Sequence, residues 1–132
     1  MSEELVAPPG LDEARGWVGY RLDEIGGAEV GQVHGFFVDA EDGRPTWMIA
    51  RQGRLRGTLA AIPIGSCAAG DGRAWVAQER DAIRSAPVVD PTRPLLREHE
   101  LTICAHYGAG ENVSRASEVV GRPENSVTAQ PS

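Results

Sequence analysis

The sequence predicts a mainly β fold, a small curled sheet that is followed by one or two short helices. Three strand-like runs and two glycine-marked turns are packed into residues 22–63. Runs of aromatic and aliphatic residues that are bounded by turn residues are typical of strands. Apolar residues at helical spacing occur only towards the C-terminal part of the chain, so the helices are expected to follow the sheet.

The strands are expected, in chain order, at residues 17–22, 29–39, 45–51, 57–64 and 73–77. The second and third strands should form a hairpin, because Asp42 and Gly43 between them make a favoured turn dipeptide. Gly31 and Gly35 interrupt the second strand. They are the expected positions of a bulge or sharp bend, which a curled sheet requires.

Two helices are expected after the last strand. The first covers residues 78–85 and is stopped by Pro87. The second begins at residue 92 or 94 and runs to residue 107, where Gly108 provides a C-cap. Three apolar residues recur on one face of this second helix and are expected in the core: Leu96, Ile103 and Tyr107.

The core of the sheet should contain Val33, Trp47 and Ile62, because each lies in the middle of a strand that turn residues bound. Phe36 and Phe37 are adjacent on the second strand, so their side chains must point to opposite faces. One ring should enter the core of the sheet. The other should lie outside it, under the C-terminal helix or at a dimer contact.

The chain of 132 residues and 14.1 kDa is expected to hold one domain. Residues 1–14 and 109–132 are rich in polar and small residues, which bury too little apolar surface to offset the entropy lost on ordering. Both segments are therefore predicted to be flexible tails. The domain itself should cover residues 15–108.

The net charge of −6 makes nucleic acid an improbable partner, since every phosphate contact needs a cation. No apolar run is long enough to cross a bilayer, and the N-terminal residues lack the pattern of a signal peptide. These observations predict a cytoplasmic protein without a membrane span.

No constellation of residues predicts catalysis, a cofactor or a metal. His99, His106 and Cys104 lie near one another on the expected second helix, but a structural zinc site needs four ligands with at least one closely spaced pair. Cys67 and Cys104 are expected to be buried free thiols. The acidic residues crowd turns and exposed helix positions, where structural roles are usual.

Arginines form the one charge feature that departs from the acidic background. Arg51, Arg54 and Arg56 crowd the tip of the hairpin between the third and fourth strands, with Arg44 nearby. Cations at a strand edge also discourage aggregation, so a solvated hairpin tip is one interpretation. The other is a docking point for an acidic segment of a partner protein.

The order of five short runs carries a family resemblance: Val18-Gly19-Tyr20-Arg21-Leu22, Gly26-Gly27-Ala28-Glu29-Val30-Gly31-Gln32-Val33, Phe37-Val38-Asp39, Trp47-Met48-Ile49-Ala50 and Ile62-Pro63. Two later segments continue it: Asp81-Ala82-Ile83-Arg84-Ser85-Ala86-Pro87 and His106-Tyr107-Gly108. Over residues 15–108 the chain resembles a PRC-barrel domain, a small β-barrel named for the photosynthetic reaction centre.

The resemblance implies a PRC-type β-barrel that is a non-enzymatic module for protein interaction or scaffolding. It implies a homodimer that also binds a further protein, not yet identified. The residues expected to contact a partner are Arg44, Arg51, Arg54, Arg56 and Phe36. The alternative is an adaptor for RNA or ribosome assembly that uses the arginine-bearing hairpin.

Overall fold

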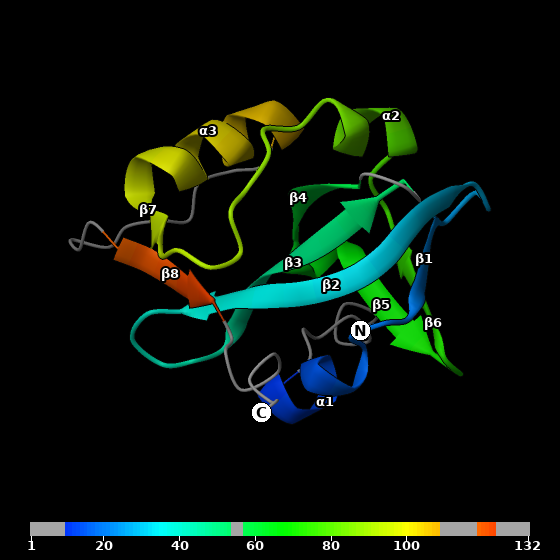
Figure 1. Cartoon of the computed structure of the whole chain (residues 1–132), viewed down its shortest axis with the longest axis horizontal. Coiled ribbons are helices and arrows are strands. Elements are labelled where there is room, and N and C mark those ends of the chain that lie inside the picture. The colour runs from blue at the N-terminus through cyan, green and yellow to red at the C-terminus, as the bar shows by residue number, and fades with distance from the viewer. Residues whose placement is uncertain (1–9, 54–56, 109–118, 124–132) are drawn as a thin grey trace, which may run out of the picture.

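The structure is a computed structural model that describes residues 10–53, 57–108 and 119–123 (Figure 1). Its elements, in chain order, are α1 (Leu11–Gly16), β1 (Arg21–Glu24), β2 (Glu29–Asp39), β3 (Pro45–Gln52), β4 (Thr58–Pro63), the 3₁₀ turn η2 (Ile64–Ser66), β5 (Cys67–Gly70), β6 (Arg73–Val76), α2 (Arg80–Arg84), β7 (Leu95–Leu96), α3 (Arg97–Tyr107) and β8 (Val119–Pro123).

Six strands follow one another across the sheet in the order β4-β3-β2-β1-β6-β5. Strand β8 pairs with β7 and with the C-terminal end of β2. Neighbouring strands are antiparallel except β1 and β6, which are parallel. The mainly β class with short helices is confirmed.

The sheet is not closed into a barrel within the described residues, because β4 and β5 stand at its two ends. The turn η2 leads β4 directly into β5, and β5 then pairs with β6 rather than back with β4. The closed PRC-type barrel therefore stays a prediction.

The long strand β2 bends where its glycines lie. The β2–β3 register shifts between Val33 and Gly35, which confirms the expected bulge. Gly31 has a φ of 156°, and a Cβ added there would overlap the carbonyl oxygen of Arg51. Glycine is needed at residue 31 because the backbones of the two strands approach too closely for a side chain.

The sheet is packed on both faces. The inner cluster takes residues from α1, α2 and six strands, and includes Val33, Phe36, Met48 and Ile62. The outer cluster lies between the sheet and the segment that carries α3. Its buried members are Phe37, Trp47, Ile49, Ala61, Val89, Leu95, Ile103 and Cys104. In Figure 1, α3 and α1 lie on opposite sides of β2.

The structure confirms that the core residues predicted in mid-strand are buried: Val33, Trp47 and Ile62 are 1%, 4% and 0% exposed. Phe36 and Phe37 point to opposite faces, as expected. Phe37 lies in the outer cluster with Ile103 of α3, whereas Phe36 lies in the inner cluster beside the Trp17 ring. The assignment of Phe36 as a partner contact is wrong, because its side chain is only 2% exposed.

Two ordered elements lie inside the segments that were expected to be tails. Helix α1 begins at Leu11, and its Ala14 is fully buried in the inner cluster. Strand β8 pairs with β2 through residues 121–123. The first strand also begins later than predicted, at Arg21, because Trp17 caps α1 and buries its ring in the core.

The second half of the chain also differs from the predicted strands and helices. Strand β5 was not predicted, since Cys67–Gly70 holds only small residues. Leu96 lies in β7, before α3, and is 42% exposed, so its assignment to the core face was wrong. Gly108 does cap α3, in the left-handed conformation with a φ of 70°.

Candidate functional site

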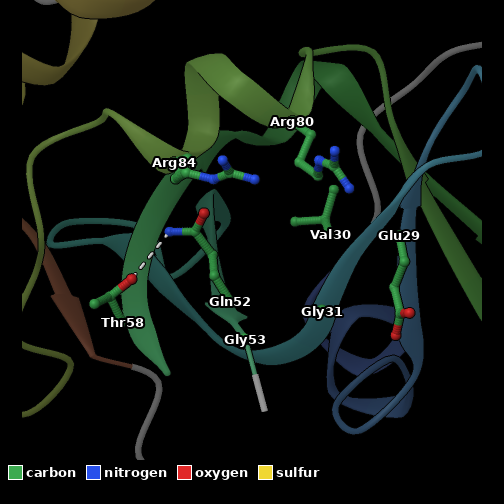
Figure 2. A pocket seen from close by; sticks show the side chains of 8 residues that line it. All are labelled: Glu29, Val30, Gly31, Gln52, Gly53, Thr58, Arg80 and Arg84. Atoms are coloured by element: carbon green, nitrogen blue, oxygen red, sulfur yellow. Dashed lines mark hydrogen bonds between the residues drawn. The ribbon is translucent and has the colours of Figure 1, made fainter. Parts of the chain in front are cut away.

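The candidate site is a hollow where α2 lies beside the ends of β2, β3 and β4 (Figure 2). We call it the arginine hollow. It has a volume of about 410 Å³, and the side chains and backbone that line it belong to Glu29, Val30, Gly31, Gln52, Gly53, Thr58, Arg80 and Arg84.

Helix α2 carries the two arginines of the hollow. Arg80 and Arg84 are four residues apart, so they share one side of this five-residue helix. Ile83 anchors the helix, because its side chain is fully buried in the inner cluster. Figure 2 shows the Arg84 guanidinium above Gln52 and the Arg80 guanidinium beside Val30.

Two contacts hold α2 in place from outside the helix. The carboxylate of Glu24 accepts a hydrogen bond from the backbone N–H of Arg80, with an N···O distance of 2.6 Å. A ring nitrogen of His106, on α3, lies 2.7 Å from the carbonyl oxygen of Ala82. The arginines are therefore presented by a helix that is tied to both β1 and α3.

The floor of the hollow is mostly backbone. Gly31 and Gly53 contribute no side chain, and Gly31 pairs with Gln52 across the two strands. The Gln52 amide nitrogen donates a hydrogen bond to the Thr58 hydroxyl at 3.2 Å. In Figure 2 the Gln52 amide oxygen is turned towards α2.

The hollow is cationic on a chain of net charge −6. Arg84 has an ion-pair partner in Asp81, but the pair is 3.9 Å long and its side chains are 62% and 83% exposed. Such a pair stabilises the helix little and leaves the guanidinium available. The Arg80 side chain makes no ion pair with any described residue. Glu29, on the lip, is the one carboxylate among the described lining residues.

A second hollow adjoins the first and brings in Arg51. We call it the side hollow. It has a volume of about 330 Å³ and is lined by Glu29, Gly31, Gln32, Arg51 and Gly53. His34 lies near Arg51; burial, and then the positive charge of Arg51, lower the pKa of His34.

The structure separates the arginines that the sequence grouped. Arg44 precedes the first residue of β3, and Arg51 lies near its last, so they are roughly 20 Å apart at about 3.3 Å per residue. The expectation that Arg44 joins a basic cluster with Arg51 is therefore wrong. Arg54 and Arg56 lie outside the described residues.

Sequence reasoning missed Arg80 and Arg84. Their signal was the spacing of four residues on a short helix whose Ile83 faces inward. That pattern indicates one shared outer side. It does not indicate that this side meets the end of β3, some thirty positions earlier in the chain.

Several other polar side chains have structural partners. Asp23 accepts hydrogen bonds from Arg21 at 2.9 Å and Arg73 at 2.8 Å. Burial alone would raise the pKa of Asp23, but the two arginines outweigh it and the pKa is lowered. The Trp47 indole donates to Glu100 at 2.9 Å.

The Tyr107 hydroxyl donates to the carbonyl oxygen of Ala61 at 2.8 Å, and burial first, then the nearby Cys67, raise the pKa of Tyr107. Burial likewise raises the pKa of the Cys67 thiol. Cys67 and Cys104 are both buried, as predicted. In the described part of the chain, no three His, Cys, Asp or Glu side chains gather as metal ligands would.

The comparisons with known proteins give no family. Neither the models of known protein families nor the curated proteins match this chain. Among residues 10–53, 57–108 and 119–123, no helix has both the length and the apolar character that a membrane crossing needs.

Proposed function

We propose that this chain is a cytoplasmic, non-enzymatic protein-interaction module, related to PRC-barrel domains, that docks an acidic segment of a partner protein. The docking site is the arginine hollow. One observation carries the proposal: Arg80 and Arg84 face a hollow in which no described carboxylate pairs closely with either guanidinium. Guanidinium groups bind carboxylates through charge-assisted hydrogen bonds.

The rest of the site supports a binding role. The sheet is packed on both faces, so it is a firm scaffold for α2. Several buried or half-buried polar groups already make hydrogen bonds within the fold: Asp23, Glu100, His106 and Tyr107. The two arginines differ from these groups, because they face solvent from a side of α2 that the core does not use.

A homodimer is the second part of the proposal. Strand β5 pairs on one side only within the described residues, with β6. An edge of this kind is a template for pairing with another strand, and a twofold partner can cover it with its own copy. Light scattering at micromolar concentration should give about twice the mass of one chain. A monomer at every accessible concentration would refute the homodimer and leave the docking proposal standing.

The alternative function, an RNA or ribosome-assembly adaptor, has weaker support. It relied on a basic hairpin, and the structure places Arg44 and Arg51 at opposite ends of β3. The net charge of −6 also opposes binding to a phosphate backbone.

The test compares peptide and RNA binding. We expect a fluorescein-labelled peptide of six glutamates to bind the wild-type chain, and the Arg80→Gln/Arg84→Gln variant to bind it about tenfold more weakly. Arg93→Gln is the matched control, since it removes one positive charge outside the hollow. Equal binding by all three proteins would refute docking in the hollow. Tighter, steeply salt-dependent binding of a single-stranded RNA would favour the adaptor.

A further inference from the structure

The two end strands of the sheet differ in how their outer edges are covered. At β4, Ala60 forms a β-bridge with Val88. The next residue, Val89, donates its N–H to the Leu59 carbonyl at 3.0 Å. At the other end, β5 pairs only with β6 among the described residues. The chain therefore covers one edge with its own segment and leaves one edge of β5 without a partner strand in the part that is described.

Hydrogen bonds around the β5–β6 hairpin show which backbone groups of β5 point outwards. The Ala77 N–H donates to the Ser66 carbonyl at 2.8 Å, whereas the Val76 carbonyl accepts a bond from the residue that follows β1. Bonded and non-bonded pairs alternate along an antiparallel ladder. Cys67, opposite Val76, and Ala69, two residues further on, therefore turn their N–H and C=O groups away from β6.

The outward groups of β5 form a pattern that can match itself. The N–H of Cys67 is already bonded to the Ile64 carbonyl at the end of η2. This leaves the C=O of Cys67 and the N–H and C=O of Ala69 without a backbone bond to any described residue. An acceptor and a donor two positions apart on one edge pair reciprocally when a second copy of the strand lies alongside in the opposite direction.

Strand β5 carries no feature that would keep a second strand away. Natural edges are protected by charged side chains, proline or bulges. The residues of β5 are Cys-Ala-Ala-Gly, and they pair with β6 without a shift of register. Each copy has a net charge of −6, so two copies repel one another least where the contact itself is uncharged.

The sheet face beside this edge is open and partly apolar. Ala68 is exposed and lies opposite Trp75 of β6, a half-buried residue that belongs to neither buried cluster. The outer cluster under α3 draws its strand residues from β2, β3 and β4 together with β7, and none from β5 or β6. A strand added to β5 would remove Ala68 and part of Trp75 from water, which adds apolar burial to the backbone bonds.

We propose that two copies of the chain join edge to edge through β5, in antiparallel orientation, about a twofold axis at Ala68. The Ala69 N–H of each copy donates to the Cys67 carbonyl of the other, and the two Ala68 side chains meet on the exposed face. The inference rests on the homodimer of the proposed function and names its contact. An axis at Ala69 would instead bring the charged Asp71 opposite the buried Cys67, which disfavours that register.

Cysteine cross-linking of the full chain tests the register. Ala68→Cys should give a disulfide-linked dimer on mild oxidation, because residues that face each other at a non-bonded pair have Cα atoms about 4.5 Å apart, within disulfide range. Ala77→Cys is the control. It is also exposed, but three strand spacings of about 4.8 Å keep the two cysteines more than about 14 Å apart. The wild-type chain should not cross-link, since Cys67 and Cys104 are buried.

A proline substitution tests the hydrogen bonds. Ala69→Pro removes an N–H that faces away from β6, so circular dichroism should show the wild-type fold. Two bonds are lost per dimer, and the dissociation constant from light scattering over a dilution series should rise at least about tenfold. Ala68→Pro is the contrasting variant, because it removes an N–H that bonds to β6 and should lower the melting temperature of the chain instead.

The outcomes separate this inference from the proposed function. A dimer in which Ala68→Cys does not cross-link, or cross-links only when mixed with Gly70→Cys, would overturn the axis at Ala68 and leave the homodimer standing. A monomer at every concentration would refute the homodimer itself, with the acidic docking site unaffected. Slow amide exchange of Ala69 in such a monomer would show that another segment of the same chain covers the edge, and would overturn the inference.

Discussion

The two ends of the β2–β3 ribbon share one pair of strands and differ in what their side chains do. At the aromatic end, residues 36–39 and 45–47, Phe36 and Phe37 fill opposite faces and Trp47 pairs with Phe37. At the glycine end, residues 29–32 and 51–53, Gly31 pairs with Gln52 and the arginine hollow opens. One end buries its side chains, and the other leaves backbone and charge exposed.

The difference shows how a small sheet can combine stability with a binding site. Apolar area removed from water stabilises a fold by about 25 cal/mol per Å². The aromatic end therefore contributes most of the packing free energy of the ribbon. The glycine end contributes less, so its surface can carry Arg51 and face Arg80 and Arg84 of α2, exposed cations that add little to stability. The comparison predicts that substitutions at the two ends differ in how much they lower the free energy of unfolding.

The largest effect is expected at the aromatic end. Trp47→Ala removes a side chain that is 4% exposed, together with its hydrogen bond to Glu100, and should lower the free energy of unfolding by about 3 to 5 kcal/mol. Urea denaturation measures the change. Trp75→Ala, at a half-buried position of β6, is the control and should cost less. Equal costs for the two would contradict the comparison.

A second large effect is expected at the one point where the glycine end is tightly packed. Gly31→Ala places a Cβ against the Arg51 carbonyl at an unfavourable φ, and should cost about 1 to 3 kcal/mol. Gly35→Ala is the matched control, because a Cβ there meets no atom within 4 Å. Thermal melts of both variants check this. A stable Gly31→Ala protein would mean that the strands separate easily at this end.

A pH-dependent effect is expected from Asp23, on the strand beside the glycine end. The pKa of Asp23 is lower in the folded chain than the ordinary 3.8. The ionised carboxylate therefore stabilises the fold above pH 3.8, and this stabilisation is lost as the pH falls through the pKa that Asp23 has in the folded chain. Asp23→Asn should cost about 1 kcal/mol at pH 7. The difference between variant and wild type should shrink as the pH falls below 3.8. A difference that is constant from pH 7 to pH 2 would exclude the ion pairs as its source.

The smallest effect is expected in the arginine hollow. Arg80→Gln/Arg84→Gln should change the free energy of unfolding by less than about 0.5 kcal/mol, as is usual for exposed side chains. The same urea titration used for Trp47→Ala measures it. A cost above about 1 kcal/mol would show that these arginines hold the fold together, and would weaken the argument that they are there to bind a partner.

Local chemistry was enough to predict several parts of the molecule. The hairpin at Asp42 and Gly43 and the C-cap at Gly108 follow from the few backbone conformations that these residues favour. The opposite orientations of Phe36 and Phe37 follow from the pleat of a strand, whatever the rest of the chain does. Turn chemistry and alternation act over a few residues, so they can be read from the sequence.

Only the tertiary structure decided where these pieces meet. It placed Arg84 beside Gln52, separated Arg44 from Arg51 and buried Phe36, which the sequence had assigned to a partner contact. The pairing of β1 with β6 and of β2 with β8 joins segments that are far apart in the chain. Such contacts depend on which apolar faces cover one another across the whole fold, and no local pattern encodes that choice. The arginine hollow exists because α2 is anchored by Ile83 next to strand ends that carry glycine.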